Sequence, residues 1–283
     1  DRVASRGLGD VYKRQVDIIP LFETIPDLEV CKKIMQTLYE NDQYRKHLSS
    51  RGNKQTVMLG FSDGTKDGGY FMANWSIYKA KEDLTGLSNS YGISVAFFDG
   101  RGGPPARGGG NTHEFYASMG KKIQADDIQL TIQGQTISSN FGTDDSCQYN
   151  LEQLLSSGIQ NQVFNSERNA LSDEDRNTMD QLAIVSHKAY QDFKARPEFI
   201  PYLEEMTTLN FYAKANIGSR PSKRGSSKKL DFTDLRAIPF VGSWSQSKQN
   251  VPGFYGVGTA LKFFEDNIKF DKVTQLYQQS SFF

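Results

Sequence analysis

The sequence predicts an α/β fold that is helical over most of its length and contains half of a TIM-like (β/α)8 barrel. Four short apolar runs alternate with segments whose apolar residues recur at helical spacing, and this alternation is typical of a parallel sheet. The runs are apolar at consecutive positions, as expected for strands covered on both faces. No GxGxxG string follows a run, so four βα units fit half of a barrel better than a complete dinucleotide-binding domain.

Each predicted strand precedes a predicted helix. The strand–helix pairs, in chain order, are residues 16–23 with 27–49, 56–63 with 68–84, 92–100 with 112–119, and 128–134 with a helical tail. After Gln135 the pattern becomes mainly helical. Ser172 and Asp175 have the spacing of a capping box. The apolar residues that then mark one face of a long amphipathic helix are Met179, Leu182, Ala183, Tyr190 and Phe193.

We expect three segments along the chain. Residues 16–140 hold the barrel units with their active-site loops, and residues 141–283 form a mainly helical region with a basic loop at 217–229. Residues 1–15 have neither a hydrophobic period nor capping signals. Their string SRGLGDVYKRQ resembles a translated transposon-end adaptor from sequencing libraries, so we expect a non-native segment, with an ordinary disordered N-terminus as the alternative. The chain closes on two phenylalanines in a periodic stretch, and we expect a fragment truncated at both ends.

The composition argues against several classes of protein. The 33 Lys and Arg residues balance 33 Asp and Glu residues, which gives no overall attraction to nucleic acid or membranes. No apolar stretch approaches the roughly 18 residues of a membrane span, and the first residues are charged, so we expect a cytoplasmic protein. Cys31 and Cys147 show neither disulfide nor zinc-ligand spacing, and we expect both to be buried.

Charged residues close the first two predicted strands. Glycines gather just after the apolar runs, where barrel enzymes place their active-site loops. Asp63 ends the second run, Lys66 follows three residues later, and Glu23 ends the first run. A carboxylate beside an ammonium group at a strand end can hold a hard cation and a phosphate together. The alternative is a tight turn with a solvated ion pair.

The most distinctive string is FFDGRGGPPARGGG at 97–110, which places Arg101 and Arg107 in glycine-rich backbone directly after a predicted strand. Two guanidinium groups can bind a phosphate or a carboxylate bidentately. The alternative is an RGG-type RNA-binding segment, but such segments are disordered and recur many times, whereas this string occurs once. The histidines lie in predicted helices without metal-ligand spacing: His47, His113 and His187.

Four motifs in order resemble the phosphoenolpyruvate carboxylase family. They are PLFET at 20–24, VMLGFSDGTKDGG at 57–69, FFDGRGGPPARGGG at 97–110, and IGSRPSKR with LRAIP at 217–239. The resemblance covers residues 16–283 and implies the C-terminal half of a (β/α)8 barrel elaborated by helices. It also implies a Mg²⁺ or Mn²⁺ cofactor, a homotetramer, and small-metabolite allosteric effectors, with no nucleic-acid or membrane partner. The implied reaction carboxylates phosphoenolpyruvate with bicarbonate to oxaloacetate and phosphate, which feeds the tricarboxylic acid cycle.

The matching motif positions imply roles for single residues. Glu23 and Asp63 would bind the divalent cation, and Lys66 would be a catalytic lysine. The arginines that would bind the phosphate and carboxyl groups are Arg101, Arg220 and Arg236, of which the first and last would also be catalytic. Arg107 would occupy the effector position of the glycine loop, and Lys223 and Arg224 would lie on a loop that closes over the site.

Three positions depart from the family pattern. Asp99 stands where the pattern has the histidine of His-Gly-Arg-Gly-Gly, and we expect a catalytic carboxylate that can accept a proton but cannot supply a cation. Phe61 and Gly64 replace a tyrosine and a serine around Asp63, which is a milder change. We expect the intact protein to be active and this segment alone to be inactive, because half a barrel exposes sheet edges and core surface.

Two other functions stay open at this stage. Another metal-dependent barrel enzyme acting on phosphoenolpyruvate or pyruvate, such as a mutase or an aldolase, would share Glu23 and Asp63 but would need no bicarbonate. An RNA-binding surface made of the arginine–glycine loop and residues 214–229 would show steep salt dependence without a need for divalent metal.

Overall fold

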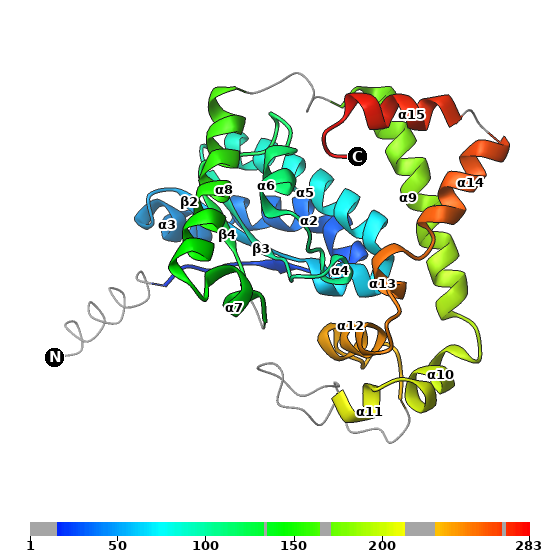
Figure 1. The fold of residues 1–283 in the computed structure, drawn as a ribbon. Coiled ribbons are helices and arrows are strands. Elements are labelled where there is room, and N and C mark those ends of the chain that lie inside the picture. The colour runs from blue at the N-terminus through cyan, green and yellow to red at the C-terminus, as the bar shows by residue number, and fades with distance from the viewer. Residues whose placement is uncertain (1–15, 133–134, 165–170, 213–229, 268–269) are drawn as a thin grey trace.

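The structure is a computed structural model, and it describes residues 16–132, 135–164, 171–212, 230–267 and 270–283. The predicted adaptor-derived segment 1–15 and the basic loop at 217–229 lie outside the described residues. Figure 1 shows the sheet with helices packed beside it, and the last helices of the chain gathered around a long helix.

Four parallel strands form one sheet, and strands that are neighbours in the sheet are also neighbours in the sequence. They are β1 (Leu21–Phe22), β2 (Lys54–Gly60), β3 (Ser94–Gly100) and β4 (Ile128–Leu130). β2 and β3 pair along their full length, so Gly60 lies opposite Gly100 at the carboxyl end of the sheet. The predicted mainly helical α/β fold with a parallel sheet is confirmed. Within the described residues, the sheet does not close into a barrel.

Helices connect the strands. They are α2 (Ile25–Glu40), α3 (Asp42–Ser50), α4 (Phe61–Gly68), α5 (Tyr70–Ser90), the 3-10 helix η1 (Pro105–Arg107) and α6 (Thr112–Ala117). The predicted helix 27–49 is divided at Asn41, whose side chain accepts hydrogen bonds from two backbone N–H groups and so caps α3. Gly69, with a φ of 78°, lets the chain turn from α4 directly into α5.

The second predicted strand is shorter than expected, which moves Asp63 into a helix. β2 ends at Gly60, and α4 begins at the next residue. Asp63 therefore lies in the first turn of α4, where a carboxylate interacts favourably with the helix dipole. Its predicted position at the end of a strand is wrong, although its place at the carboxyl end of the sheet is retained.

Only one face of the two long strands is fully covered within the described residues. Val57, Leu59 and Phe97 are almost completely buried and belong to the same core as α2 and α5. Met58 and Phe98, which point to the other face, are only partly buried. Ala96, on the same face as Phe98, is buried, so within the described residues the second face of the sheet is partly covered.

The second half of the chain is helical. Its helices are α7 (Gln135–Phe141), α8 (Asp144–Val163), α9 (Asp173–Lys194), α10 (Phe199–Met206), α11 (Leu209–Tyr212), α12 (Ala237–Gln246), α13 (Val251–Phe254), α14 (Val257–Asn267) and α15 (Phe270–Gln279). Ser172 and Asp175 form the predicted capping box of α9. The predicted apolar face of α9 is confirmed, since Met179, Leu182 and Tyr190 are buried.

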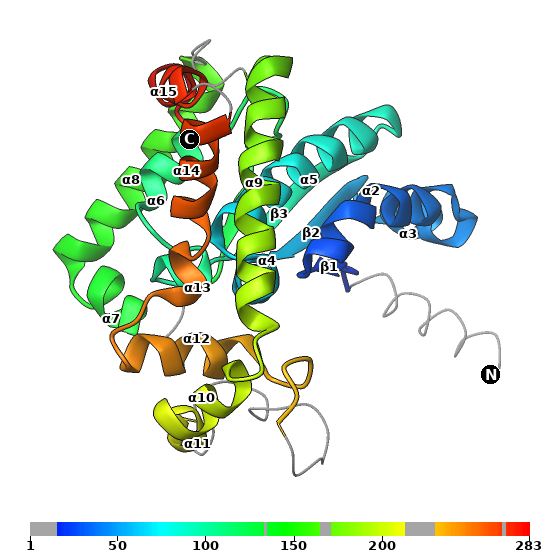
Figure 2. The ribbon, with the colours of Figure 1, turned by 90° about the vertical axis from the view of Figure 1, so that its right-hand side faces the viewer.

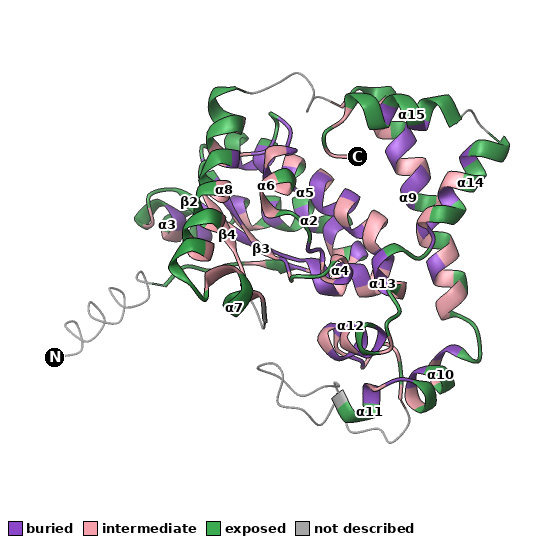
Figure 3. Cartoon of the chain, viewed as in Figure 1, coloured by how far each residue is buried: buried purple, intermediate pink, exposed green. Residues whose placement is uncertain are grey.

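Two clusters of buried apolar side chains stabilise the molecule. The larger joins β2 and β3 to α2, α5 and the first part of α9, and the smaller joins α10 to α12. Phe193 near the end of α9 packs against the smaller cluster, so this helix, conspicuous in Figure 2, connects the two. Figure 3 shows buried residues concentrated on β2, β3, α5 and α9, whereas α8 is largely exposed. Cys31 is buried as predicted, but Cys147 is only partly buried.

None of the helices in the described part of the chain is both long enough and apolar enough to cross a membrane.

Candidate functional site

Two carboxylates, Glu23 and Asp63, lie at the carboxyl end of the sheet. Glu23 directly follows β1, and Asp63 lies where β2 passes into α4. The backbone of Gly60 approaches Glu23 so closely that a Cβ atom added to Gly60 would be 2.4 Å from Glu23 Cβ. One added to Gly64 would be 3.3 Å from the Glu23 carbonyl oxygen. Glycines on both sides of Asp63 therefore let Glu23 pack against the turn that carries it.

The two carboxylates suit an open site for a hard cation. Among the residues that the structure describes, no group of three or more His, Cys, Asp or Glu side chains could hold a metal ion. Mg²⁺ differs from a structural zinc ion in needing only one or two protein carboxylates, with water and substrate oxygens as its other ligands. Glu23 and Asp63 match that requirement in number and in type of donor.

Lys66 lies one helical turn after Asp63 and reaches the segment that leads into α12. Its ammonium group donates a hydrogen bond of 2.5 Å to the carbonyl oxygen of Leu235 and lies 4.5 Å from the ring centroid of Phe232. Arg236, the next residue along, is the N-cap residue of α12, and its buried Nε has no hydrogen-bond partner among the described residues. An unpartnered buried guanidinium nitrogen is a donor available to an anion.

Lys194, at the end of α9, is a second lysine beside Lys66. Its ammonium group donates to the carbonyl oxygens of Lys66 at 3.3 Å and Asp67 at 2.5 Å, and so binds the last turn of α4. Both lysines also face the Phe232 ring. Burial lowers the pKa of Lys194 to about 8; the Asp67 carboxylate opposes this shift, and the Lys66 charge adds to it. Lys194 is not among the site residues predicted from the sequence.

Arg101 is held in a folded glycine-rich loop. Four backbone hydrogen bonds close the loop between Gly102 and Gly109. Arg101 is only 7% exposed, its Nε donates to the carbonyl oxygen of Gly108 at 2.8 Å, and its guanidinium carbon lies 3.9 Å from the ring centroid of Phe115. Burial lowers the pKa of Arg101. The Arg101 side chain thus retains donors for a bidentate anion in a position fixed by the loop.

Arg107 approaches the same region from η1. Its Nε donates to the hydroxyl oxygen of Ser62 at 3.1 Å, and its side chain packs along Gly102, where a Cβ atom would be 2.6 Å from Arg107 Cβ. Ser62 is the residue before Asp63. The loop after β3 is therefore bonded directly to the helix that carries the acidic site.

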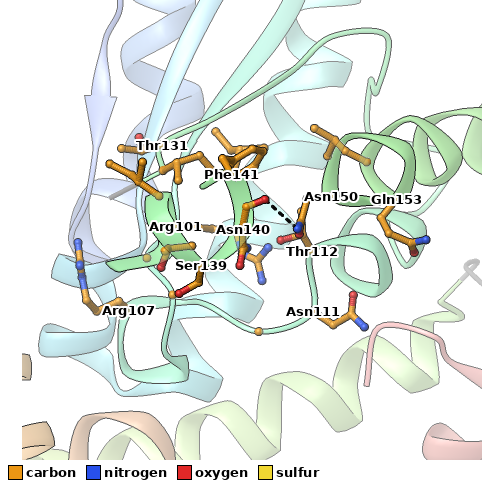
Figure 4. Close-up of a pocket in the computed structure, with 18 of the residues that line it drawn as sticks. Arg101, Arg107, Asn111, Thr112, Thr131, Ser139, Asn140, Phe141, Asn150 and Gln153 are labelled. Atoms are coloured by element: carbon orange, nitrogen blue, oxygen red, sulfur yellow. Dashed lines mark hydrogen bonds between the residues drawn. The ribbon is translucent and has the colours of Figure 1, made fainter. Parts of the chain in front are cut away.

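Arg101 and Arg107 both line a cavity of about 1310 Å³. Figure 4 shows its polar lining, which comes from the glycine-rich loop, the start of α6, α7 and α8, and includes Asn111, Thr112, Ser139, Asn140 and Asn150. Ile238 of α12 also contributes, so the segment that follows Arg236 borders the same cavity. A cavity of this size can hold a small anionic metabolite.

Asp99 does not point into this cavity but is enclosed between helices. Its carboxylate is 1% exposed, and its Oδ2 lies 2.7 Å from Lys81 Nζ and 2.8 Å from the Tyr116 hydroxyl, which donates to it. Burial lowers the pKa of Lys81, and the nearby carboxylate opposes this shift. Burial and the same carboxylate raise the pKa of Tyr116. These contacts favour a positioning role for Asp99 over direct contact with substrate.

Lys81 is not among the residues predicted from the motifs, although the sequence carries a signal for it. Ile77, Tyr78 and Leu84 mark the buried face of α5, and Lys81 falls on that face at helical spacing. A lysine inside an apolar stripe requires a buried counter-ion. The partner was not evident because Asp99 lies on a strand, beyond any local pattern.

Three predicted site residues are not described, and of the histidines only His113 lines the cavity. Arg220, Lys223 and Arg224 fall within 213–229, outside the described residues. His47, His113 and His187 lie on α3, α6 and α9, in helices as predicted.

Comparison with known proteins agrees with the motif resemblance. The sequence model of the family described as phosphoenolpyruvate carboxylase matches residues 4–283. The chain is also 39% identical over 257 residues to the phosphoenolpyruvate carboxylase of Corynebacterium diphtheriae. This match covers 91% of the chain but only 28% of that relative.

Proposed function

Because the chain belongs to the phosphoenolpyruvate carboxylase family, we propose that the whole protein carboxylates phosphoenolpyruvate with bicarbonate to give oxaloacetate and phosphate. The observation that carries the proposal is the convergence of Glu23, Asp63 and Lys66 with Arg101 and the start of α12 at one end of the sheet. These residues come from four separate segments of the chain. They combine carboxylates for a cation with guanidinium groups for a phosphate.

The chemistry of the reaction explains these residue types. Bicarbonate attacks the phosphate of phosphoenolpyruvate, which gives carboxyphosphate and the enolate of pyruvate. Carboxyphosphate then releases carbon dioxide, and the enolate captures it. Phosphate is left when carbon dioxide departs. Apart from neutral carbon dioxide every species is anionic, so a site that surrounds them with positive charge favours the reaction. At an effective dielectric constant of about 20, one opposite charge at about 4 Å contributes about 4 kcal/mol before desolvation costs.

We assign roles to the cationic residues from the cavity that Arg101 lines and from the bond that joins Lys66 to Leu235, the residue before Arg236. Arg101 would bind the phosphate, with its planar guanidinium oriented by Phe115 and Gly108. Arg236, whose buried Nε is unpartnered among the described residues, would bind the phosphate or carboxyl group. Lys66 would stabilise the negative charge that develops between them. Arg220 would complete this set, and closure of the loop at 217–229 would keep water from the enolate.

Glu23 and Asp63 would hold Mg²⁺ or Mn²⁺. When bound, the cation would supply Lewis-acid stabilisation of the negative charge on the substrate. The close packing of Glu23 on Gly60 places Glu23 against the turn that carries Asp63.

The strand order supports a larger barrel around this sheet. In a doubly wound sheet the strand order reverses at a switch point, whereas β1 to β4 follow one another without reversal. The half-covered residues Met58 and Phe98 lie on the face that would point into the barrel. We propose that the sheet is the C-terminal half of a (β/α)8 barrel, that the whole protein is a homotetramer, and that Arg107 responds to a small-metabolite effector.

The test is bicarbonate-dependent formation of oxaloacetate and phosphate by the whole protein, with and without Mg²⁺. Activity that needs both additives, and that is lost in Asp63→Asn, supports the proposal. Turnover of phosphoenolpyruvate that needs the metal but not bicarbonate would instead identify a mutase or an aldolase.

A further inference from the structure

A buried ion pair lies directly beside Arg101, and the proposed mechanism does not use it. The pair joins Lys81 to Asp99 at 2.7 Å, with side chains only 3% and 1% exposed. Because Tyr116 donates to the same carboxylate oxygen, α5, β3 and α6 meet at one atom. Asp99 Oδ1 is buried and has no hydrogen-bond partner among the described residues.

The ring of Phe115 connects this ion pair to Arg101. Lys81 Nζ lies 5.5 Å from the ring centroid, and the Arg101 guanidinium carbon lies 3.9 Å from it. The rings of Phe97 and Tyr116 lie 5.3 Å and 5.7 Å from Lys81 Nζ. Phe115 and Tyr116 are consecutive residues of α6, so the hydrogen bond from Tyr116 to Asp99 also helps to fix the position of Phe115. Arg101 therefore stacks on a ring that the ion pair holds in place.

The two charges of the pair require each other. A buried ammonium group without a counter-ion is strongly unfavourable, and so is a buried carboxylate without a cation. Where the family pattern has histidine, this chain has Asp99. A neutral imidazole would leave the Lys81 charge uncompensated, and a protonated one would repel it. Aspartate at 99 and lysine at 81 are therefore a matched pair.

We propose that Lys81 is a positioning residue for Arg101, acting through Asp99, Tyr116 and Phe115, and that it provides the charge balance that permits aspartate at position 99. This inference rests on the proposed function, because it takes Arg101 to bind the phosphate of phosphoenolpyruvate. The contribution of Lys81 is to keep the stacking platform fixed before the substrate arrives.

The test compares Lys81→Gln, Asp99→Asn and the double variant in the whole protein. Three quantities are measured: Tm, the shift in Tm that phosphoenolpyruvate causes, and the KM for phosphoenolpyruvate. Each single variant leaves one buried charge unpaired, and we expect a lower Tm, a smaller ligand-induced shift and a KM raised about tenfold. The neutral double variant should regain most of the Tm and a KM within about threefold of the wild type.

A matched control is available on the same helix. Glu82, the next residue after Lys81, forms a bidentate ion pair with Arg176 of α9, with both contacts at 2.7 Å. Neither residue of this pair lines the cavity that Arg101 lines. Glu82→Gln should lower the Tm but leave the KM for phosphoenolpyruvate unchanged.

The outcomes separate this inference from the proposed function. If Lys81→Gln lowers the Tm but leaves the KM and the ligand-induced shift unchanged, as in Glu82→Gln, the positioning role is refuted. If the Tm and KM of the double variant are no closer to the wild type than those of the single variants, the idea of a matched pair is refuted. A wild type that binds phosphoenolpyruvate without bicarbonate-dependent turnover would overturn the proposed reaction alone, because the ligand-induced shift still tests Lys81. A wild type that does not bind phosphoenolpyruvate would overturn both.

Discussion

The ammonium group of Lys66 donates a 2.5 Å hydrogen bond to the carbonyl oxygen of Leu235, 169 residues later in the chain. This bond places the helix that carries Asp63 beside the residue that precedes Arg236. The Lys66 side chain thus joins the helix of Asp63 to the segment that carries Arg236. Loss of Lys66 would remove a charge and also loosen the position of Arg236.

We predict that Lys66→Met lowers kcat/KM for phosphoenolpyruvate at least about 100-fold, which is typical for the loss of one donor aimed at developing charge. Lys66→Arg should recover little, since a planar guanidinium cannot reproduce the compact ammonium contact with Leu235. Steady-state kinetics of the whole protein test this. Lys188→Met is the control, because Lys188 is exposed on α9. The activity of this variant should match that of the wild type. A Lys66→Met enzyme with near-normal kcat/KM would rule out the assigned role.

We predict that Gly60→Ala weakens the metal site without changing either of its ligands. The new Cβ atom would lie 2.4 Å from Glu23 Cβ and 3.0 Å from its Cα, so the backbone after β1 must move. The Mg²⁺ concentration for half-maximal activity should rise at least about tenfold, since a displacement of this size disrupts ligand geometry. Gly86→Ala in α5 meets nothing within 4 Å and is the control. It should keep the normal Mg²⁺ requirement and gain about 0.5–1 kcal/mol of stability from helix propensity.

We predict a stability change with pH that depends on Lys194. Its pKa in the folded protein is about 8, against an ordinary value of 10.5. Between these values the unfolded chain binds more protons than the folded one, so the free energy of unfolding rises with pH through this interval. Below about pH 8 Lys194 is protonated in the folded protein, so the desolvation cost of its buried charge lowers the free energy of unfolding in full.

Urea unfolding of the wild type and Lys194→Met from below pH 8 to above pH 10.5, which spans the folded and ordinary pKa values, measures the effect. The wild type should gain stability relative to the variant as the pH rises above about 8. A constant difference between the two proteins would show that the Lys194 pKa is not lowered.

The order of the elements could be read from the sequence because it depends on local patterns. Alternating apolar runs and helical periods identified the parallel sheet, and Ser172 with Asp175 marked the start of α9. The position of Asp63 could not be read this way. The string FSD continues an apolar run, whereas β2 ends at Gly60, whose backbone packs closely against Glu23.

The contacts that organise the site were also beyond local patterns. Motif positions named Lys66 and Arg101, but the partners that hold them lie far away or on other elements. Lys81 compensates Asp99 across a helix–strand contact, and Lys194 binds the end of α4 from another helix. Such pairs follow from tertiary packing, which a single sequence does not encode at fixed spacing.

The two buried clusters each contain one of the two tryptophans of the chain. Trp75 lies in the larger cluster, where its indole nitrogen donates to Asp180, and Trp244 lies in the smaller cluster with its indole nitrogen unpartnered in the described residues. Each indole therefore reports on the surroundings of one cluster. Replacing either tryptophan by phenylalanine would leave a single emitter, so fluorescence can show whether the α10–α12 end of the molecule melts before the sheet.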